Sequence, residues 1–171
     1  MNATVGYGLE LYGTQTTTVK NNTIIMRGIY SIGMGFAHAA GNIIDSNNIT
    51  TYGDSSLKIQ SVVEEIVPAN VGIKLQQGSG NSNITNNQIK TNDENKKATT
   101  INVVGSDDVI IKNNIVDTNV LNGEESISAN GTGVKSENNT SYKSKTQTVV
   151  DLPSEAVTST NITIKVNVID I

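Results

Sequence analysis

The chain contains no cysteine, no tryptophan, one phenylalanine and two prolines among its 171 residues. Without cysteine it cannot form disulfides, thiolate zinc sites or a cysteine nucleophile. Its single histidine, His38, cannot supply a histidine-rich metal site. It has one arginine, Arg27, and a formal charge of −4. We therefore expect no nucleic-acid partner, because nucleic-acid binding depends on a basic surface.

Long apolar runs are also missing. No stretch approaches the roughly 18 apolar residues of a membrane-spanning helix, so we expect no membrane span. The first residues, MNATVGYG, carry neither the basic nor the apolar segment of a signal peptide. Because a methionine stands directly before a strand-like repeat, we expect the chain to be a fragment of a longer surface protein. The Cys-free, Asn/Thr/Ser-rich composition favours an extracellular or cell-surface location.

Asn, Thr and Ser together make up 58 residues, and Ile and Val together make up 38 against only six Leu. β-branched side chains favour strands over helices. A hydrophobic fraction of 36% provides enough apolar surface for a core and argues against disorder. The length suits a single domain spanning residues 1–171.

One pattern recurs along the chain: an aliphatic residue, two further residues, an asparagine, one residue and a second aliphatic residue. Its copies are Val19–Asn22–Ile24, Ile44–Asn47–Ile49, Ile84–Asn87–Ile89, Ile111–Asn114–Val116 and Ile164–Asn167–Ile169. The asparagines are 25, 40, 27 and 53 residues apart, which indicates a period near 26 with insertions. Residues 101–117 also overlay residues 154–170 without a gap. Such a period predicts stacked, structurally equivalent units.

Each unit is too short to hold a helix as well as its two or three alternating runs. We therefore predict coils of three short parallel strands, stacked about 4.8 Å apart. Ile and Val should point inward, and Glu10, Lys74 and Asn102 should point outward. Turning between strands requires a residue that tolerates the left-handed region, and asparagine does so readily. We expect the turn side chains to form a hydrogen-bonded ladder of Asn22, Asn47, Asn87, Asn114 and Asn167.

The segments VKNNTI, IDSNNI, ITNNQI, IKNNIV and IKVNVI resemble the right-handed parallel β-helix repeat of the pectate-lyase-like superfamily. They are similar in particular to Asn-rich, adhesin-like surface proteins of methanogenic archaea and bacteria. The resemblance covers about residues 8–118 and 154–171. It implies an all-β fold: a single-stranded right-handed parallel β-helix solenoid of about six coils. Because the motif residues are structural, it implies little about function.

Three segments depart from the repeat. Residues 57–70 form a lateral insertion whose apolar spacing suits a short amphipathic helix or flap, ended by Pro68. Residues 119–153 should hold a degenerate coil around Asn139, with a long exposed loop near SENNTSYKSKTQ. Residues 33–41 should add about five residues to the second coil.

Enzymes of the superfamily cleave acidic polysaccharides with clustered Asp residues, or with a base and bound calcium. Here only Gly105–Lys112, with Asp107 and Asp108, faintly resembles the Gly-Asp-Asp element of the hydrolases. The other elements of those hydrolases are absent, and Thr160 and Asn161 replace the acidic pair in the aligned coil. We interpret Asp107 and Asp108 as turn residues and predict no catalytic site.

Other candidate residues are weaker, and we predict no metal and no cofactor. Calcium could bind carboxylates, but no calcium-loop spacing joins Asp54, Asp93, Glu94, Glu124 and Glu125. His38, predicted to lie near Arg27 and Tyr30, could mark a small binding site. Tyrosines could stack on sugar rings, with Tyr12 and Tyr30 forming a platform if they share a face; the five are Tyr7, Tyr12, Tyr30, Tyr52 and Tyr142.

Glycosylation sequons begin at Asn2, Asn21, Asn48, Asn83, Asn130, Asn138, Asn139 and Asn161. We favour Asn130, Asn138 and Asn139 as glycan sites, because these should lie in exposed loops.

Two functions fit these observations. The first is a non-enzymatic, adhesin-like segment of a cell-surface solenoid that binds glycans or neighbouring cells and can self-associate end to end or side by side. The second is a polysaccharide-cleaving β-helix enzyme, a lyase or glycoside hydrolase, or a phage tailspike-like fragment. The missing catalytic elements favour the first.

Overall fold

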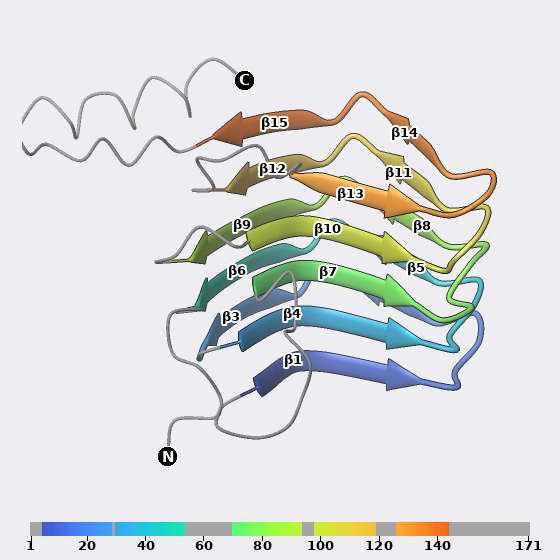
Figure 1. Cartoon of the computed structure of the whole chain (residues 1–171), viewed down its shortest axis with the longest axis horizontal. Coiled ribbons are helices and arrows are strands. Elements are labelled where there is room, and N and C mark those ends of the chain that lie inside the picture. The colour runs from blue at the N-terminus through green and yellow to red at the C-terminus, as the bar shows by residue number, and fades with distance from the viewer. Residues whose placement is uncertain (1–4, 29, 54–69, 94–97, 119–125, 144–171) are drawn as a thin grey trace, which may run out of the picture.

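In the computed structural model, three parallel sheets of five strands each stack into a β-solenoid (Figure 1). The structure describes residues 5–28, 30–53, 70–93, 98–118 and 126–143. The predicted all-β parallel solenoid is confirmed. It has five rungs of three strands, and therefore about four full turns rather than six coils. The repeat around Asn167 lies outside the described residues. Within them, no helix that could cross a membrane occurs.

Each rung contributes one strand to each sheet, and all neighbouring strands are parallel. Sheet 1 consists of β1 (Val5–Tyr12), β4 (Tyr30–Ala37), β7 (Asn70–Gln76), β10 (Ala98–Val104) and β13 (Ile127–Asn130). Sheet 2 consists of β2 (Thr18–Lys20), β5 (Ile43–Asp45), β8 (Asn83–Thr85), β11 (Ile110–Lys112) and β14 (Lys135–Glu137). Sheet 3 consists of β3 (Thr23–Arg27), β6 (Asn48–Gly53), β9 (Gln88–Asp93), β12 (Ile115–Thr118) and β15 (Thr140–Lys143).

The core consists of columns of aliphatic side chains, one per rung, as the alternation predicts. In sheet 2, Ile44, Ile84 and Ile111 pair in register and are fully buried. Sheet 1 contributes a column through Leu9, Met34, Ile73, Ile101 and Ile127. Sheet 3 contributes a column through Ile24, Ile49, Ile89, Val116 and Ser141. The register predicted from the overlay of Leu9, Ile73 and Ile101 is therefore confirmed.

The asparagine ladder is present between sheets 2 and 3. Asn47 Nδ2 donates to Val19 O at 2.9 Å and to Asn87 Oδ1 at 3.0 Å. Its backbone N–H donates to the same Asn87 Oδ1 at 2.9 Å. The pattern repeats upward through Asn114 to Asn139, so the ladder contains Asn22, Asn47, Asn87, Asn114 and Asn139. Asn167, the fifth predicted member, lies outside the described residues.

The ladder asparagines do not themselves adopt the left-handed conformation, and this part of the prediction was wrong. Positive φ values occur one residue earlier, at Asn21, Ser46, Asn86, Asn113 and Asn138. Each of these residues turns the chain. In the first four rungs, its backbone N–H also donates to a carbonyl of the rung above, as Asn86 does to Lys112 O at 3.1 Å. The turn directs the side chain of the next residue, the ladder asparagine, into the interior. There its amide forms hydrogen bonds in place of the strand-to-strand backbone bonds that are interrupted at the turn. Two adjacent residues therefore have different roles: the first turns the chain, and the second connects the rungs through its side-chain amide.

Two further expectations need correction. Residues 33–41 are not an insertion, because β4 pairs residue by residue with β1, Met34 with Leu9 and Phe36 with Leu11. The expected exposed loop near residues 136–147 is replaced, over the described part, by the end of β14 and by β15. The insertion predicted at 57–70 lies outside the described residues except for Asn70, the first residue of β7.

Two buried threonines carry a cost that suggests a stabilising substitution. Thr51 and Thr91 are fully buried neighbours in sheet 3, and neither hydroxyl has a hydrogen-bond partner among the described residues. A buried unpaired hydroxyl costs about 1–3 kcal/mol, so Thr91→Val should raise the unfolding free energy by about 1 kcal/mol. Thr85→Val is the matched control and should destabilise, because Thr85 Oγ1 donates to Asp45 Oδ1 at 2.7 Å. Urea denaturation measures both, and destabilisation by Thr91→Val would contradict the assignment.

Candidate functional site

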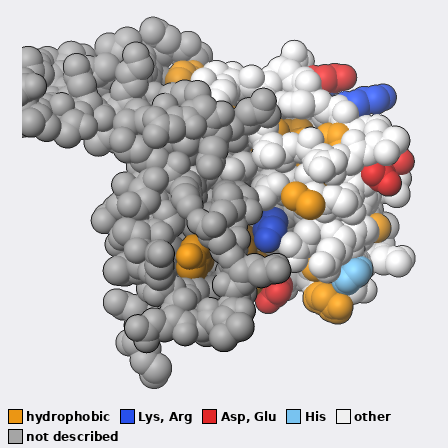
Figure 2. All heavy atoms as spheres, in the orientation of Figure 1, with side chains coloured by type: hydrophobic (Ala, Val, Ile, Leu, Met, Phe, Trp, Pro, Cys, Tyr) orange, Lys and Arg blue, Asp and Glu red, His pale blue; other side chains and the backbone are white. Residues whose placement is uncertain are grey.

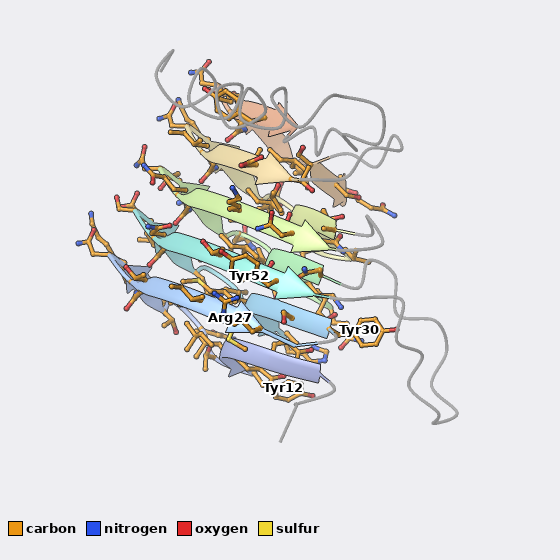
Figure 3. The ribbon with its side chains drawn as sticks, turned by 90° about the vertical axis from the view of Figure 1, so that its left-hand side faces the viewer. Tyr12, Arg27, Tyr30 and Tyr52 are labelled. Carbon is orange, nitrogen blue, oxygen red and sulfur yellow. The ribbon has the colours of Figure 1, made fainter. Side chains whose placement is uncertain are left out.

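Tyr12, Tyr30 and Tyr52 lie apart from one another rather than gathered on one face (Figure 3). Tyr12 pairs with Ala37 at the end of β4, whereas Tyr30 pairs with Val5 at the start of β1. The seven intervening steps separate the two residues by about 23 Å along the strands. The expected platform of Tyr12 and Tyr30 was therefore wrong.

The expected neighbourhood of His38, Arg27 and Tyr30 is not formed either. Arg27 ends β3 and Tyr30 begins β4, but His38 follows the other end of β4. His38 lies eight residues beyond Tyr30, which is about 26 Å along the strand direction. Instead, His38 contacts Tyr12 and Arg27 contacts Tyr52, so the structure contains two separate aromatic pairs.

The first pair lies where the strands of sheet 1 end. The Tyr12 and His38 ring centroids are 5.3 Å apart with an interplanar angle of 78°. This edge-to-face contact uses the face of only one ring. Tyr12 remains 70% exposed, more than any other large hydrophobic side chain of the described residues. His38 has a φ of 53°, and its N–H donates to Gln77 O at 3.1 Å, so the turn backbone fixes its position.

The register extends this pair into an uncharged strip that follows the stack. Tyr12 stands in one column with Ala37, Gln76, Val104 and Asn130. We call Tyr12, His38, Gln76, Gln77, Val104 and Asn130 the Tyr12 strip. Val104 is 45% exposed, and Gln77 and Asn130 are also exposed. In Figure 2 most side chains over these strand ends are uncharged, with a few acidic and basic side chains among them.

The second pair lies on the outer face of sheet 3. Arg27 Cζ is 4.3 Å from the centroid of the Tyr52 ring, a cation–π contact that covers one face of that ring (Figure 3). Tyr52 is 36% exposed. No carboxylate among the described residues pairs with Arg27, whereas the lysines of three rungs pair with acids. These pairs are Lys20–Asp45 at 2.8 Å, Lys90–Asp117 at 3.4 Å and Lys112–Glu137 at 3.6 Å.

Burial and charge alter the pKa values on the outer face of sheet 1. Burial, and secondarily the Glu10 carboxylate, raises the pKa of Tyr7. Burial alone lowers the pKa of Lys74. Glu10, Lys74 and Asn102 share the outward column as predicted, but Lys74 is half-buried and Asn102 is only 4% exposed.

Asp45 is the most strongly stabilised carboxylate among the described residues. The Lys20 ammonium and the side chains of Asn86 and Thr85 bond to it, both side chains at 2.7 Å, and Ser46 Oγ bonds to it at 3.0 Å. These contacts, led by Lys20, hold the pKa of Asp45 well below its usual value. The cluster connects β2, β5 and β8, which are neighbouring strands of sheet 2, and it therefore stabilises the fold.

The lowered pKa of Asp45 predicts how stability depends on pH. A carboxylate with a depressed folded pKa contributes stability above its unfolded pKa of about 3.9, and this is lost as the pH falls towards the folded value. Wild type should therefore be more stable than Asp45→Asn at pH 6, and the difference should shrink below about pH 4. Urea denaturation of both proteins from pH 7 to pH 2.5 measures this. A difference independent of pH would contradict the role of the charge.

The candidate catalytic carboxylates belong to a turn. Asp107 Oδ1 accepts the backbone N–H of Thr132 at 2.7 Å, which ties the turn to the next rung. Asp108 has a φ of 54° and donates its own N–H to Thr132 O at 2.8 Å. This geometry agrees with their interpretation as turn residues.

No three His, Asp or Glu side chains of the described residues converge in a way that could hold a metal ion. Of the carboxylates considered for calcium, Asp93 ends β9. Asp54, Glu94, Glu124 and Glu125 lie outside the described residues.

The structure separates the glycosylation sequons into different environments. Asn139 was favoured as a glycan site, but its Nδ2 donates to Ile111 O and Ser136 Oγ, so it is committed to the ladder. Asn21, Asn130 and Asn138 are exposed. Asn48 and Asn83 face outward on sheets 3 and 2, and Asn2 and Asn161 lie outside the described residues.

Gln76, Gln77, Val104 and Asn130 were not predicted to share a surface with Tyr12. The signal was available: the overlay of Leu9–Leu11 on residues 101–103, extended by one residue, places Tyr12 in the column of Val104.

The chain was compared with protein-family models, curated proteins and solved structures. No family model matches the chain, and no curated protein or solved structure is significantly similar to it.

Proposed function

We propose that this chain is a non-enzymatic segment of an adhesin-like cell-surface solenoid, and that it binds glycans through the Tyr12 strip. The observation that carries the proposal is the 70% exposed Tyr12 ring, fixed by His38 at one end of a column of uncharged side chains. An exposed aromatic face can stack on the apolar face of a sugar ring. Amide side chains provide both donors and acceptors for sugar hydroxyls.

The stacked fold supports this role because it makes the strip rigid. Tyr12, Gln76 and Val104 stand in one column of hydrogen-bonded parallel strands, with Ala37 between Tyr12 and Gln76. Successive positions in the column lie about 4.8 Å apart. A ligand bound along such a column loses little free energy in ordering the protein. The uncharged character of the strip favours neutral glycans.

The alternative, a polysaccharide-cleaving enzyme or tailspike-like fragment, draws no support from a specific site. Asp107 and Asp108 hold a turn, and the aligned sequence lacks the acidic pair. Incubation with pectin, alginate and other polysaccharides, with and without calcium, tests this alternative. We expect no turnover. Turnover that is lost in Asp107→Asn would establish the enzymatic function and overturn our proposal.

Glycan-array binding of the full chain tests the proposed function. We expect binding to a subset of neutral glycans and at least tenfold weaker binding by Tyr12→Ala, equivalent to about 1.4 kcal/mol. Tyr52→Ala is the matched control, because it removes an exposed tyrosine from another sheet and should leave binding unchanged. Equal loss in the two variants, or no glycan binding by wild type, would contradict the role of the strip.

A further inference from the structure

Among the described residues, no further rung covers the backbone or the core side chains at the lower edge of the first rung. β1, β2 and β3 are the terminal strands of their three sheets (Figure 1). The inward side chains Leu9, Leu11 and Ile24 are only partly buried. Their equivalents one rung above, Met34, Phe36 and Ile49, are at most 1% exposed. An unpaired strand edge beside apolar surface is a template for another strand.

The asparagine ladder determines which hydrogen-bonding group is left unpaired at this edge. From Asn47 to Asn139, every ladder Oδ1 accepts the backbone N–H and the Nδ2 of the asparagine one rung below. Asn22 Oδ1 has no such donor among the described residues, and Asn22 is exposed. A partner that continues the ladder must therefore present an asparagine with free N–H groups to Asn22.

The fifth rung is a poor partner for this edge. The positions equivalent to Val19 and Ile24 are occupied by Ser136 and Ser141. Asn139 Nδ2, moreover, is already bonded to Ser136 Oγ at 3.0 Å. Small polar side chains on an outer rung are typical of a capping repeat, which ends a stack rather than extending it.

One further copy of the repeat exists in the chain. Ile164–Asn167–Ile169 has the same spacing as Val19–Asn22–Ile24 and lies outside the described residues. We propose that the lower edge of the first rung binds this repeat from a second copy of the chain. Asn167 then donates to Asn22 Oδ1, while Ile169 covers the partly buried Ile24 and Ile164 continues the column of Val19, which is itself only 7% exposed.

This contact is heterologous, because it joins two different surfaces of identical chains. Repetition of a heterologous contact that does not close gives an open, head-to-tail assembly. The inference goes beyond the proposed function and does not depend on it. If both hold, assembly also repeats the Tyr12 strip along one body, which would increase avidity for repeated surface glycans.

Sedimentation velocity of the full chain over a wide concentration range tests the proposal. We expect species heavier than the 18.1 kDa single chain, increasing with concentration. The double variant Asn167→Ala, Ile169→Lys should remain a single chain, while Asn161→Ala, a matched change outside the repeat, should assemble as wild type does. Wild type that remains a single chain at every concentration would overturn the proposal.

A peptide added in trans keeps the test decisive if a variant folds poorly. A labelled peptide of residues 160–171 should bind the full-length double variant at its vacant edge and inhibit assembly of wild type. A peptide with Asn167→Ala and Ile169→Ser should do neither. Binding should be at least tenfold weaker when the receptor also carries Asn22→Ala. Binding that instead depends on Asn139 would place the repeat on the fifth rung and overturn the proposal.

Discussion

Asn87→Ala is expected to destabilise the fold by about 4 kcal/mol, because it leaves several buried groups unpaired at once. Asn87 is completely buried. Its Nδ2 donates to Ile44 O at 2.9 Å and to Asn114 Oδ1 at 3.0 Å. Its Oδ1 accepts the backbone N–H and the Nδ2 of Asn47.

The magnitude follows from the groups that remain after truncation. The carbonyl of Ile44 and the backbone N–H of Asn47 both lose a partner in the interior, and each buried unpaired group costs about 1–3 kcal/mol. Water cannot replace the amide, because Ile44 and Ile84, which flank this part of the ladder, are fully buried. A protein of this size has a total stability of only about 5–15 kcal/mol. The variant should therefore be only marginally folded at room temperature.

Urea denaturation followed by circular dichroism measures this effect. Asn48→Ala is the control, since Asn48 is an exposed asparagine on the adjacent strand and its removal should change stability by less than about 0.5 kcal/mol. Asn87→Asp is informative as well, because it keeps an acceptor for Asn47 and removes the donor to Ile44. At pH 7 its carboxylate oxygen would face the acceptors Ile44 O and Asn114 Oδ1 in the interior, so this variant should be no more stable than Asn87→Ala. Equal stability of Asn87→Ala and Asn48→Ala would refute the role of the ladder.

The register of the rungs could be predicted from the sequence because only asparagine can make the hydrogen bonds of the ladder. A buried amide that must form hydrogen bonds with the rungs above and below tolerates no substitute, so Asn47, Asn87 and Asn114 recur with aliphatic flanks at fixed spacing. The exposed Asn22 extends the series by one rung. The residue before each one needs only to tolerate a positive φ, and serine serves at position 46. That weaker requirement explains why the turning residue was misassigned.

The polar column between sheets 1 and 2 was not predicted, for a related reason. Here Asn42 Oδ1 accepts the Thr17 N–H at 3.1 Å, and Asn42 in turn donates its N–H to Ser82 Oγ at 3.1 Å. Ser79 likewise donates its N–H to Ser106 Oγ at 3.1 Å. Hydroxyls and amides perform the same task in different rungs, so no single residue type repeats. The signal that remained was the three-residue spacing of Ser79 and Ser82.

The candidate site could be predicted only in part. Tyrosine is scarce enough for composition to single out all five tyrosines as candidates, but it does not distinguish Tyr12 and Tyr52 from the others. Their partners depend on where each strand begins and ends, because Tyr12 and Tyr30 belong to adjacent strands but to opposite ends. Residue spacing within one motif carries no information about that offset. The pairing of Arg27 with Tyr52 likewise requires the register of β3 and β6.

Gly72→Ala is expected to destabilise the fold by about 3 kcal/mol, at the upper end of the range for overpacking, because the new methyl group has no space. A Cβ at Gly72 would clash with Ile89 Cγ2 and lie 2.6 Å from Thr100 O. The first contact involves the tightly packed, β-branched side chain of Ile89, and the second involves the backbone of Thr100. Neither group can move away without a large cost in free energy. Gly8 and Gly33 stand in equivalent positions against Ile24 and Ile49. A column of glycines thus allows sheet 1 to approach the isoleucines of sheet 3.

Gly6→Ala provides the matched control for this change. A Cβ at Gly6 would meet only Met26 Cε, at 3.2 Å, the far end of a flexible side chain. Alanine also restricts the unfolded chain more than glycine does, so Gly6→Ala should be neutral or slightly stabilising. Thermal denaturation should therefore show a large decrease in Tm for Gly72→Ala and almost none for Gly6→Ala. If the order is reversed, the close approach of sheets 1 and 3 does not depend on the glycine column.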